Sequence, residues 1–285
     1  MRIAYIVLAH KNPSQLERLI KRLHTPEDSF VIHIDSKADK TVYQASVKAL
    51  DKFKNVHFVT RRRKVFWGGF SQTQVMIDCL GECFEKKLEF DYVKLISGQD
   101  YPLSSTAQFK KILAASQNCS YLENFSLPHQ PWIDNGEPDG GLNRVQFFYI
   151  RIAGREIQLP FPRKLPNYIP TFFAGSAYWC LTRECASYVH RFIQKNSRFV
   201  RFFRWVANSD ELFFQTIIMN SDFSKKVIDD NLTYTDWLPH AMNPKLLTER
   251  DVDTILQSPC LFARKFDTQE NPRVLDFLDA QYRLS

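Results

Sequence analysis

The chain has 285 residues, of which 44% are hydrophobic and 24% are charged, and its formal net charge is +7. These values are typical of a folded globular protein with a sizeable core, and they exclude a disordered chain. The positive charge favours an anionic partner, such as a nucleotide, an acidic polymer or a membrane surface, although solubility alone also accounts for it.

The first hundred residues alternate between short apolar runs and helical patterns. We expect strands over residues 3–9, 30–34, 56–59 and 92–96, and helices over 13–23, 41–53 and 71–88. The first helix is expected to start with Asn12 as its N-cap and Pro13 at the first position. Such alternation predicts a mostly parallel sheet flanked by helices.

Polar residues follow three of these predicted strands. His10 and Asp35 come directly after two of them, and Asp100 ends the segment Ser97-Gly98-Gln99-Asp100 after the third. Open α/β sheets bind ligands beyond the carboxyl ends of their strands. The sequence therefore predicts a ligand site at this edge.

The pattern changes after residue 126. Residues 127–143 and 157–171 are rich in Pro, Gly, Asp or Asn and are expected to be long loops. Beyond them we expect strands over 177–181 and 261–263, helices over 183–194 and 210–219, and a helical tail from residue 267. The plentiful aromatic residues are expected mainly in the core.

Six cysteines without C-x-x-C spacing are expected to be free, mostly buried thiols, which fits a reducing compartment. No signal peptide and no apolar run of about 18 residues is visible. We expect a cytoplasmic protein, in possible peripheral contact with the inner membrane face, or a soluble part of an anchored protein.

Several catalytic motifs are missing. The sequence has no G-x-G-x-x-G, no P-loop, no G-x-S-x-G and no H-E-x-x-H. Asp35-Ser36-Lys37 has a lysine where a metal-binding D-x-D pair has its second acid. Asp229-Asp230 either binds a metal or is simply solvated, and solvation is the more common fate of such pairs.

Five segments in this order resemble one enzyme family. They are HIDSKA from His33, SGQDYPL from Ser97, AGSAYWCLTRE from Ala174, SDE from Ser209 and LFARKFD from Leu261. Together they resemble the core-2/I-branching β-1,6-N-acetylglucosaminyltransferases and the related peptide O-xylosyltransferases. The resemblance implies a single catalytic domain of GT-A type, a UDP-sugar donor, inversion at the anomeric carbon and no metal or other cofactor. Because paired cysteines and an N-terminal anchor are not visible, we expect a bacterial member.

Glu211 is the candidate catalytic base. Inverting transfer needs a carboxylate that accepts the proton of the attacking hydroxyl, and a glutamate in an S/P-D-E segment has this role in the family. A helix N-terminus at Ser209 would favour the ionised carboxylate. Acids are also common in the first helical turn for structural reasons, and Asp210 is the neighbouring alternative.

The resemblance implies donor contacts in both halves of the sequence. Lys265 matches the diphosphate-binding lysine, and Arg264 is the candidate second cation, with Lys245 and Arg250 as alternatives. The other matched positions are Leu8, Ala9, His10, Asp35, Lys37, Trp67 and Asp100. Asp35 binds the nucleotide or caps local structure, and Gly68-Gly69 permits close approach to a ligand or marks a turn.

For the acceptor, Glu123 matches a carboxylate that binds hydroxyl groups, and Trp237 is the candidate stacking platform, with a buried core position as its alternative. We expect residues 1–104 to form a nucleotide-binding half and 105–285 the acceptor-binding and catalytic half.

Two other functions compete with transfer. The first is an inactive protein of the same fold that binds a UDP-sugar or a glycan. The second is a nucleic-acid-binding protein that uses the basic run Arg61–Lys64, although this run also fits UDP, anionic lipid or a solvated turn. Strand-end acids would repel phosphates, so we expect no nucleic-acid partner.

Overall fold

The computed structural model describes the chain except residues 135, 138, 153–154, 239–240, 242 and 283–285. Contacts divide it into two compact units. Unit 1 consists of Met1–Arg62, Leu88–Asn118 and Leu232–Ser285, and unit 2 of Arg63–Lys87 and Cys119–Asn231. These bounds differ from a division at residue 104, because the C-terminal segment belongs with the N-terminal one. The functional division into halves stays a prediction.

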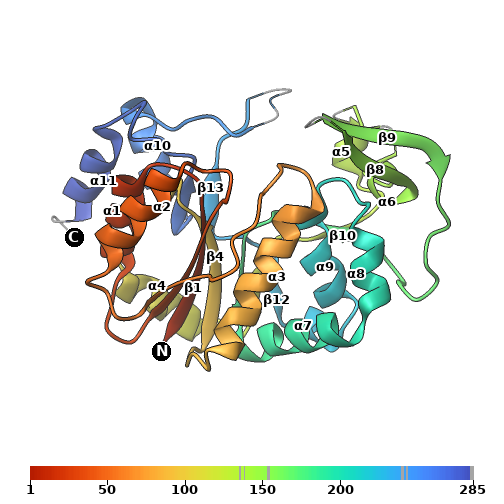
Figure 1. Cartoon of the computed structure of the whole chain (residues 1–285), viewed down its shortest axis with the longest axis horizontal. Coiled ribbons are helices and arrows are strands. Elements are labelled where there is room, and N and C mark those ends of the chain that lie inside the picture. The colour runs from red at the N-terminus through yellow and green to blue at the C-terminus, as the bar shows by residue number, and fades with distance from the viewer. Residues whose placement is uncertain (135, 138, 153–154, 239–240, 242, 283–285) are drawn as a thin grey trace. The chain divides into compact units, whose positions relative to one another are not determined.

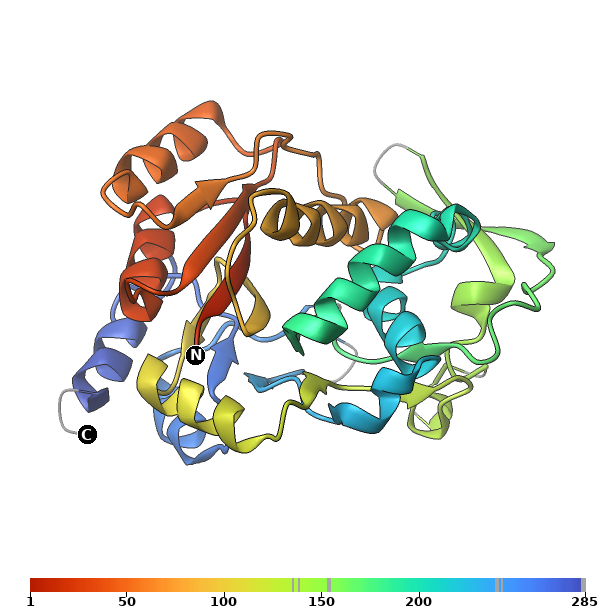
Figure 2. The same cartoon turned by 90° about the horizontal axis from the view of Figure 1, so that it is seen from below.

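Unit 1 contains the predicted parallel strands β1 (Ile3–Ala9), β2 (Ser29–Ile34), β3 (Val56–Phe58) and β4 (Tyr92–Ser97). Their order is β4-β1-β2-β3, and every neighbouring pair is parallel. Figures 1 and 2 show these strands from red to yellow among the helices of the unit. The apolar runs form strands here because β1, β2 and β4 are buried almost throughout.

The helices of unit 1 are α1 (Pro13–Leu23), α2 (Lys40–Leu50), α4 (Thr106–Ala115), α10 (Val252–Gln257) and α11 (Val274–Tyr282), with a 3-10 turn η3 (Glu249–Asp251). Helix α1 buries the apolar residues expected from its spacing. Asn12 is its N-cap, but its side chain makes no capping hydrogen bond. Instead Asn12 Nδ2 donates to Gln15 Oε1 (3.1 Å) and to Thr268 Oγ1 (2.9 Å).

A second sheet of unit 1 joins distant parts of the sequence. Its order is β13 (Thr233–Thr235), β14 (Phe262–Arg264), β5 (Asp100–Pro102). In the antiparallel pairing of β14 with β5, Arg264 lies opposite Asp100. The strand after β4 and the basic pair near the end of the chain therefore meet at one place.

Unit 2 has three small strand groups. Strands β12 (Val227–Ile228), β6 (Ser120–Leu122) and β11 (Trp179–Thr182) lie side by side, β7 (Phe125–Ser126) pairs with β10 (Phe173–Ala174), and β8 (Phe147–Ile152) forms a hairpin with β9 (Arg155–Pro162). Its helices are α3 (Phe70–Glu85), α5 (Gln130–Asp134), α6 (Asn143–Gln146), α7 (Arg183–Lys195), α8 (Ser197–Phe203) and α9 (Phe213–Met219), with 3-10 turns η1 (Ser209–Glu211) and η2 (Asp222–Lys226).

An aromatic cluster fills the core of unit 2. Phe203 and Phe213 are fully buried, with ring centroids 5.2 Å apart, and Phe199 packs against both rings. Trp179 meets Phe214 at 5.1 Å. The prediction that aromatic residues serve mainly the core is confirmed here.

Several predicted elements need correction. The loop predicted over 157–171 begins within strand β9, because the cross-strand pairing tolerates the prolines of this edge strand. Within 127–143, α5 and the start of α6 interrupt the loop, whose residues 135 and 138 lie outside the described ones. The helix predicted over 210–219 is a 3-10 turn followed by α9, and the tail becomes helical only at Val274.

Two predictions hold without change. All six cysteines are free, and four of them are buried. The fold class is the expected GT-A type: α/β, with a Rossmann-like, mostly parallel sheet flanked by helices.

Candidate active site

The carboxyl ends of β1 and β2 bring the first predicted donor residues together. Leu8 and Ala9 end β1, and Ala9 O accepts a hydrogen bond from Asp35 N (2.8 Å), which follows β2. Asp35 is buried, and its Oδ1 accepts from Lys37 N (2.8 Å). Asp35 thus caps a local turn, which is one of the two roles expected for it. Its other expected role, a contact to the nucleotide, stays a prediction.

Cations gather around His10. The ring keeps an exposed surface, but partial desolvation lowers its pKa, followed by the charges of Lys11 and Lys265. Asp35 acts in the opposite direction, and Lys37 lowers the pKa further. The pKa of Lys265 is also lowered, first by burial and then by Arg264 and Lys11. The structure therefore assembles His10, Lys37 and Lys265, predicted as donor contacts, in a basic cluster that suits an anion.

Arg264 and Asp100 form a buried ion pair. Arg264 Nε donates to Asp100 Oδ1 (3.1 Å), and the two side chains are 16% and 1% exposed. Asp100 also accepts from Ser97 Oγ (2.6 Å) and Ser97 N (2.8 Å). Both carboxylate oxygens of Asp100 are thus engaged within the protein, and the pair orients Arg264 beside Lys265.

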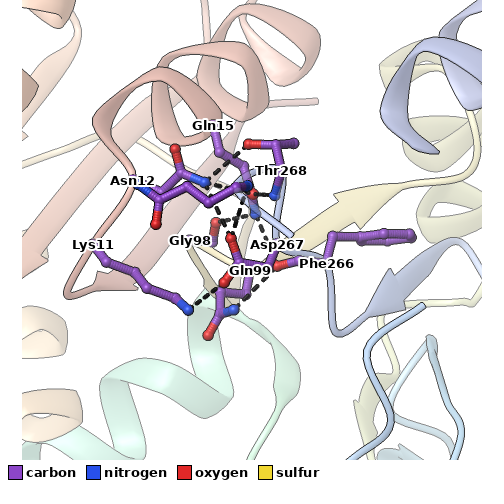
Figure 3. A network of polar contacts seen from close by, with 9 residues as sticks. Lys11, Asn12, Gln15, Gly98, Gln99, Phe266, Asp267 and Thr268 are labelled. Atoms are coloured by element: carbon purple, nitrogen blue, oxygen red, sulfur yellow. Dashed lines mark hydrogen bonds and ion pairs between the residues drawn. The ribbon is translucent and has the colours of Figure 1, made fainter. Parts of the chain in front are cut away.

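A polar network behind the cluster holds three chain segments together. Gln15 Nε2 donates to Gly98 O (3.0 Å) and Phe266 O (3.1 Å), while Gln15 Oε1 accepts from Thr268 N (2.8 Å). Figure 3 shows this amide between the loop after β4 and the segment after β14. Lys11 adds an ion pair to buried Asp267. This network could not be predicted from the sequence, because the partners of Gln15 lie more than 80 positions away.

The other candidates of unit 1 have different surroundings. Trp237 is 54% exposed, so the core alternative for it is wrong, and its stacking role stays a prediction. Lys245 pairs with Asp251 (2.5 Å) and Asp236 (3.3 Å), so its charge is already balanced by carboxylates. Arg250 lies in the η3 turn. Their roles in diphosphate binding receive no support from these contacts.

Glu211, in unit 2, has a cationic partner that the sequence analysis missed. Arg144 Nη1 donates to Glu211 Oε2 (2.9 Å), and Arg144 Nη2 donates to Glu137 Oε1 (2.8 Å). The guanidinium also lies 4.1 Å from the centre of the Trp132 ring. Arg144 is only 13% exposed, whereas 33% of the Glu211 side chain is exposed. Arg144 therefore fixes the position of the Glu211 carboxylate, while part of the Glu211 side chain stays exposed to solvent.

Burial raises the pKa of both acids in this turn. It raises the pKa of Glu211, and Arg144 opposes this rise. It raises the pKa of Asp210 to about 7, with the charge of Glu211 as the second cause. The α-helix that was expected to favour the ionised Glu211 begins only at Phe213, after the 3-10 turn that contains Glu211, and the ionisation of Glu211 stays a prediction. A carboxyl with a raised pKa is a stronger proton acceptor.

Gly175 brings Glu123 close to Glu211. Its N–H donates to Glu211 O (2.9 Å), and an added Cβ would lie 1.9 Å from Glu123 O. Only glycine permits this approach. Burial raises the pKa of Glu123, although Asn231 Nδ2 donates to its carboxylate (2.5 Å). The structure places the candidate base and this candidate acceptor residue near each other, and the acceptor role of Glu123 stays a prediction.

The predicted donor residue Trp67 lies next to the same turn. It is 52% exposed, and Gly68 after it has φ 71° and accepts from Asn208 N through its carbonyl oxygen (2.8 Å). An added Cβ at Gly68 would lie 2.7 Å from Asn208 Oδ1. Of the two alternatives for these glycines, the structure shows the turn, and close ligand approach stays a prediction.

Two residues of the run Arg61–Lys64 have structural roles. Arg62 donates to the carbonyl oxygens of Ile34 and Asp35, both at 2.9 Å, and its guanidinium lies 4.3 Å from the centre of the Tyr43 ring. Arg63 pairs with Asp78. The solvated-turn interpretation is thus wrong for these two residues, because they fix the chain around the end of β2 and on α3.

Asp229, considered as a metal ligand, accepts a hydrogen bond from Asn124 N (2.8 Å). In the part of the chain that the structure describes, no three His, Cys, Asp or Glu side chains are grouped to hold a metal ion. Within the same part, no helix has the length and hydropathy needed to cross a membrane.

Fold and site together define an α/β protein with a basic strand-end cluster in one unit and an arginine-paired carboxylate in the other. The model of the Core-2/I-Branching enzyme family matches residues 3–256. The chain therefore belongs to this family of glycosyltransferases, as its motifs predicted.

Named relatives support the same family. "Xylosyltransferase oxt" of Drosophila pseudoobscura pseudoobscura is 25% identical over 241 residues, which cover 83% of this chain and 26% of the relative. The human "Probable beta-1,3-galactosyl-O-glycosyl-glycoprotein beta-1,6-N-acetylglucosaminyltransferase 7" is 22% identical, over 99% of this chain and 68% of the relative. The chain thus spans about a quarter of the length of the first of these relatives.

Solved structures include mouse xyloside xylosyltransferase 1 in its apo form. It is 9% identical, with a TM-score of 0.43 over 92% of this chain and 97% of that one.

Proposed function

We propose that this protein is an inverting glycosyltransferase that moves N-acetylglucosamine or xylose from a UDP-sugar to a hydroxyl of a glycan or protein, without a metal ion. The observation that carries the proposal is the carboxylate of Glu211 in a chain of this family. This side chain is partly exposed, has a raised pKa and is held by Arg144. A bacterial origin stays a prediction.

In the proposed reaction, the acceptor oxygen attacks the anomeric carbon while the bond from that carbon to the diphosphate oxygen breaks. The hydroxyl proton passes to a Glu211 carboxylate oxygen, and UDP leaves with the bonding electrons. The raised pKa of Glu211 supports its role as proton acceptor. Arg144 keeps the ionised form accessible before the reaction and orients the carboxylate.

The diphosphate of the leaving group needs positive charge near it. We assign this task to Lys265 and Arg264, with His10 and Lys37 near the nucleotide. The basic cluster around His10 supports the assignment, because cations can replace a metal in balancing the charge of UDP. Leu8, Ala9, Asp35, Asp100 and Trp67 complete the proposed donor contacts, and Glu123 and Trp237 the acceptor contacts.

Calorimetry with UDP, in EDTA and again with Mn²⁺, tests donor binding. We expect binding in EDTA that Mn²⁺ leaves unchanged, and much weaker binding of uridine, which lacks the diphosphate. Binding only with Mn²⁺ would contradict metal independence, and no binding of UDP in either buffer would contradict the donor assignment.

The Glu211→Gln variant separates transfer from binding alone. We expect it to bind UDP like the wild type but to lose about 10²–10⁴-fold in turnover of UDP-N-acetylglucosamine or UDP-xylose, because a positioned base contributes that much. A wild-type protein that binds UDP yet turns over neither donor would favour the alternative, an inactive UDP-sugar or glycan-binding protein.

A further inference from the structure

The end of α7 and the whole of α8 carry positive charge that the proposed reaction does not use. From Arg191 to Trp205 the chain has five basic residues and no acidic one. Arg198, Arg201 and Arg204 are exposed and recur every three residues. Of the aromatic residues between them, Phe199 and Phe203 are buried in the core and Phe202 is partly buried. The helical period therefore places Arg198 and Arg201 on the side of α8 that faces solvent, and the exposed Arg204 follows as the C-cap of this helix.

Large apolar side chains lie exposed beside these arginines. Trp205 is 44% exposed, and it follows Arg204 directly. Trp205 O accepts from Tyr149 N (3.0 Å), and its ring lies 6.3 Å from that of Phe148, so the β8–β9 hairpin packs beside the end of α8. Figures 1 and 2 show the green hairpin and the end of α8 within unit 2.

The hairpin adds further apolar surface. Ile157 on β9 is 40% exposed, opposite Ile150 on β8, and Phe161 near the end of β9 is 68% exposed. Exposed apolar groups of this size cost free energy in water, and grouped ones mark interaction sites. Arg198, Arg201, Arg204, Trp205, Ile157 and Phe161 together are called the basic apolar face below.

We propose that the basic apolar face docks this protein on an anionic lipid bilayer. The arginines match the negative headgroups, and Trp205, Ile157 and Phe161 reach the apolar boundary below them. An RNA would pair with the arginines and stack bases on Trp205 and Phe161, but it would leave the aliphatic Ile157 in water. The mixed composition of the face thus favours lipid over a purely ionic partner.

Vesicle flotation tests this docking with the whole chain. The protein is mixed with vesicles of phosphatidylcholine alone, or with 30% phosphatidylglycerol, in buffers of about 0.1 M and 0.5 M salt. We expect flotation only with the anionic vesicles, and a strong reduction at the higher salt, because screening shortens the reach of surface charges.

Matched variants locate the contact. Replacing Arg198, Arg201 and Arg204 by alanine is expected to lower partitioning roughly a hundredfold, at about fivefold for each residue. Replacing the exposed Lys48, Lys54 and Lys111 of unit 1 removes the same charge and is expected to change partitioning less than threefold. Phe161→Ser, at a mostly exposed position, tests the apolar part, with about a fivefold loss expected at both salt concentrations.

Three results would overturn the proposal. The wild type could fail to float with anionic vesicles, or the triple arginine variant could float like the wild type. Binding of poly(U) that requires the three arginines, without flotation, would assign the face to nucleic acid instead. Thermal melts of each variant distinguish lost docking from lost folding.

Discussion

The strand-end cluster of unit 1 and the Glu211 turn of unit 2 carry opposite charges, and burial moves their pKa values in opposite directions. In unit 1 the pKa values of His10 and Lys265 fall. In unit 2 those of Asp210 and Glu211 rise. In both regions partial burial therefore disfavours the charged forms, which costs stability unless a partner or a ligand balances the charge.

The two regions balance this cost differently. In unit 1, Asp100 offsets Arg264 and Asp267 offsets Lys11, yet Lys265 still lies in the positive field of Arg264 and Lys11, which an anion would relieve. In unit 2, Arg144 balances Glu211 within the protein itself. An anionic ligand should thus strongly affect the stability of unit 1, whereas a change of pH should affect the stability of unit 2.

The largest expected effect concerns the network that supports the basic cluster. Gln15→Leu leaves the Thr268 N–H and the Gly98 carbonyl without their buried partner. We expect a loss of about 2–6 kcal/mol in the free energy of unfolding, because each of the two stranded buried groups costs roughly 1–3 kcal/mol. Urea denaturation measures it, and exposed Gln44→Leu, the control, should stay within about 0.5 kcal/mol of the wild type. A similar effect of both variants would show that the network is not stabilising.

Asp210→Asn is expected to make stability less dependent on pH. The folded-state pKa of Asp210, about 7, lies above the ordinary value of 3.8. As pH rises, the unfolded chain therefore releases this proton at a lower pH than the folded protein does. Because ionisation then favours the unfolded chain, the wild type loses stability as pH rises from about 4 to 7. The variant avoids this loss, so we expect it to gain on the order of 2–3 kcal/mol relative to the wild type at pH 8, and little at pH 4. Thermal melts across this range check the sign, and a gain that is equal at both pH values would contradict it.

Lys265→Ala tests the anion expected at the basic cluster. We expect UDP affinity to fall about ten- to a hundredfold, since a hydrogen bond to a charged group contributes roughly 1.5–3 kcal/mol. Lys265→Arg should keep most of the affinity, and exposed Lys111→Ala should leave it unchanged. Calorimetry in EDTA measures all three, and unchanged affinity in Lys265→Ala would remove this residue from the donor site.

Arg144 and Glu137 are expected to move the pH dependence of turnover in opposite directions. Arg144 lowers the pKa of Glu211, so Arg144→Gln should shift the acidic limb of the rate profile to higher pH. Glu137 raises that pKa, so Glu137→Gln should shift the limb to lower pH, by a smaller amount. Donor hydrolysis followed from pH 5 to 9 measures both shifts. Shifts of the same sign would indicate general damage rather than control of the base.

Much of unit 1 could be predicted from the sequence, because its strands are continuous apolar runs ended by polar residues. Strand β1 has the predicted bounds, Ile3–Ala9, and His10 and Asp35 follow their strands as expected. Such patterns are local, and burial on both faces enforces them.

The parts that could not be predicted depend on distant pairing. Arg144 contacts Glu211 across 67 positions of the sequence. The sequence marks Arg144 only by its position directly after a loop rich in Pro and Gly. Strand β9 contains prolines that indicate a loop, and only its partner β8 makes it a strand. Ser209, at the start of η1, likewise has a distant partner, because its hydroxyl lies 2.7 Å from that of Thr73.

Unit 1 is made of segments from both ends of the chain, and this has a consequence for synthesis on the ribosome. Lys11 and Asp267 form an ion pair across 256 positions of the sequence. Strand β5 can pair with β14 only after β14 has been synthesised. Nascent chains emerge at about 5–20 residues per second, so the first strands spend roughly ten seconds or more without these partners. Unit 2, complete before residue 232, can assemble in that interval, and we expect its core to gain protease resistance first.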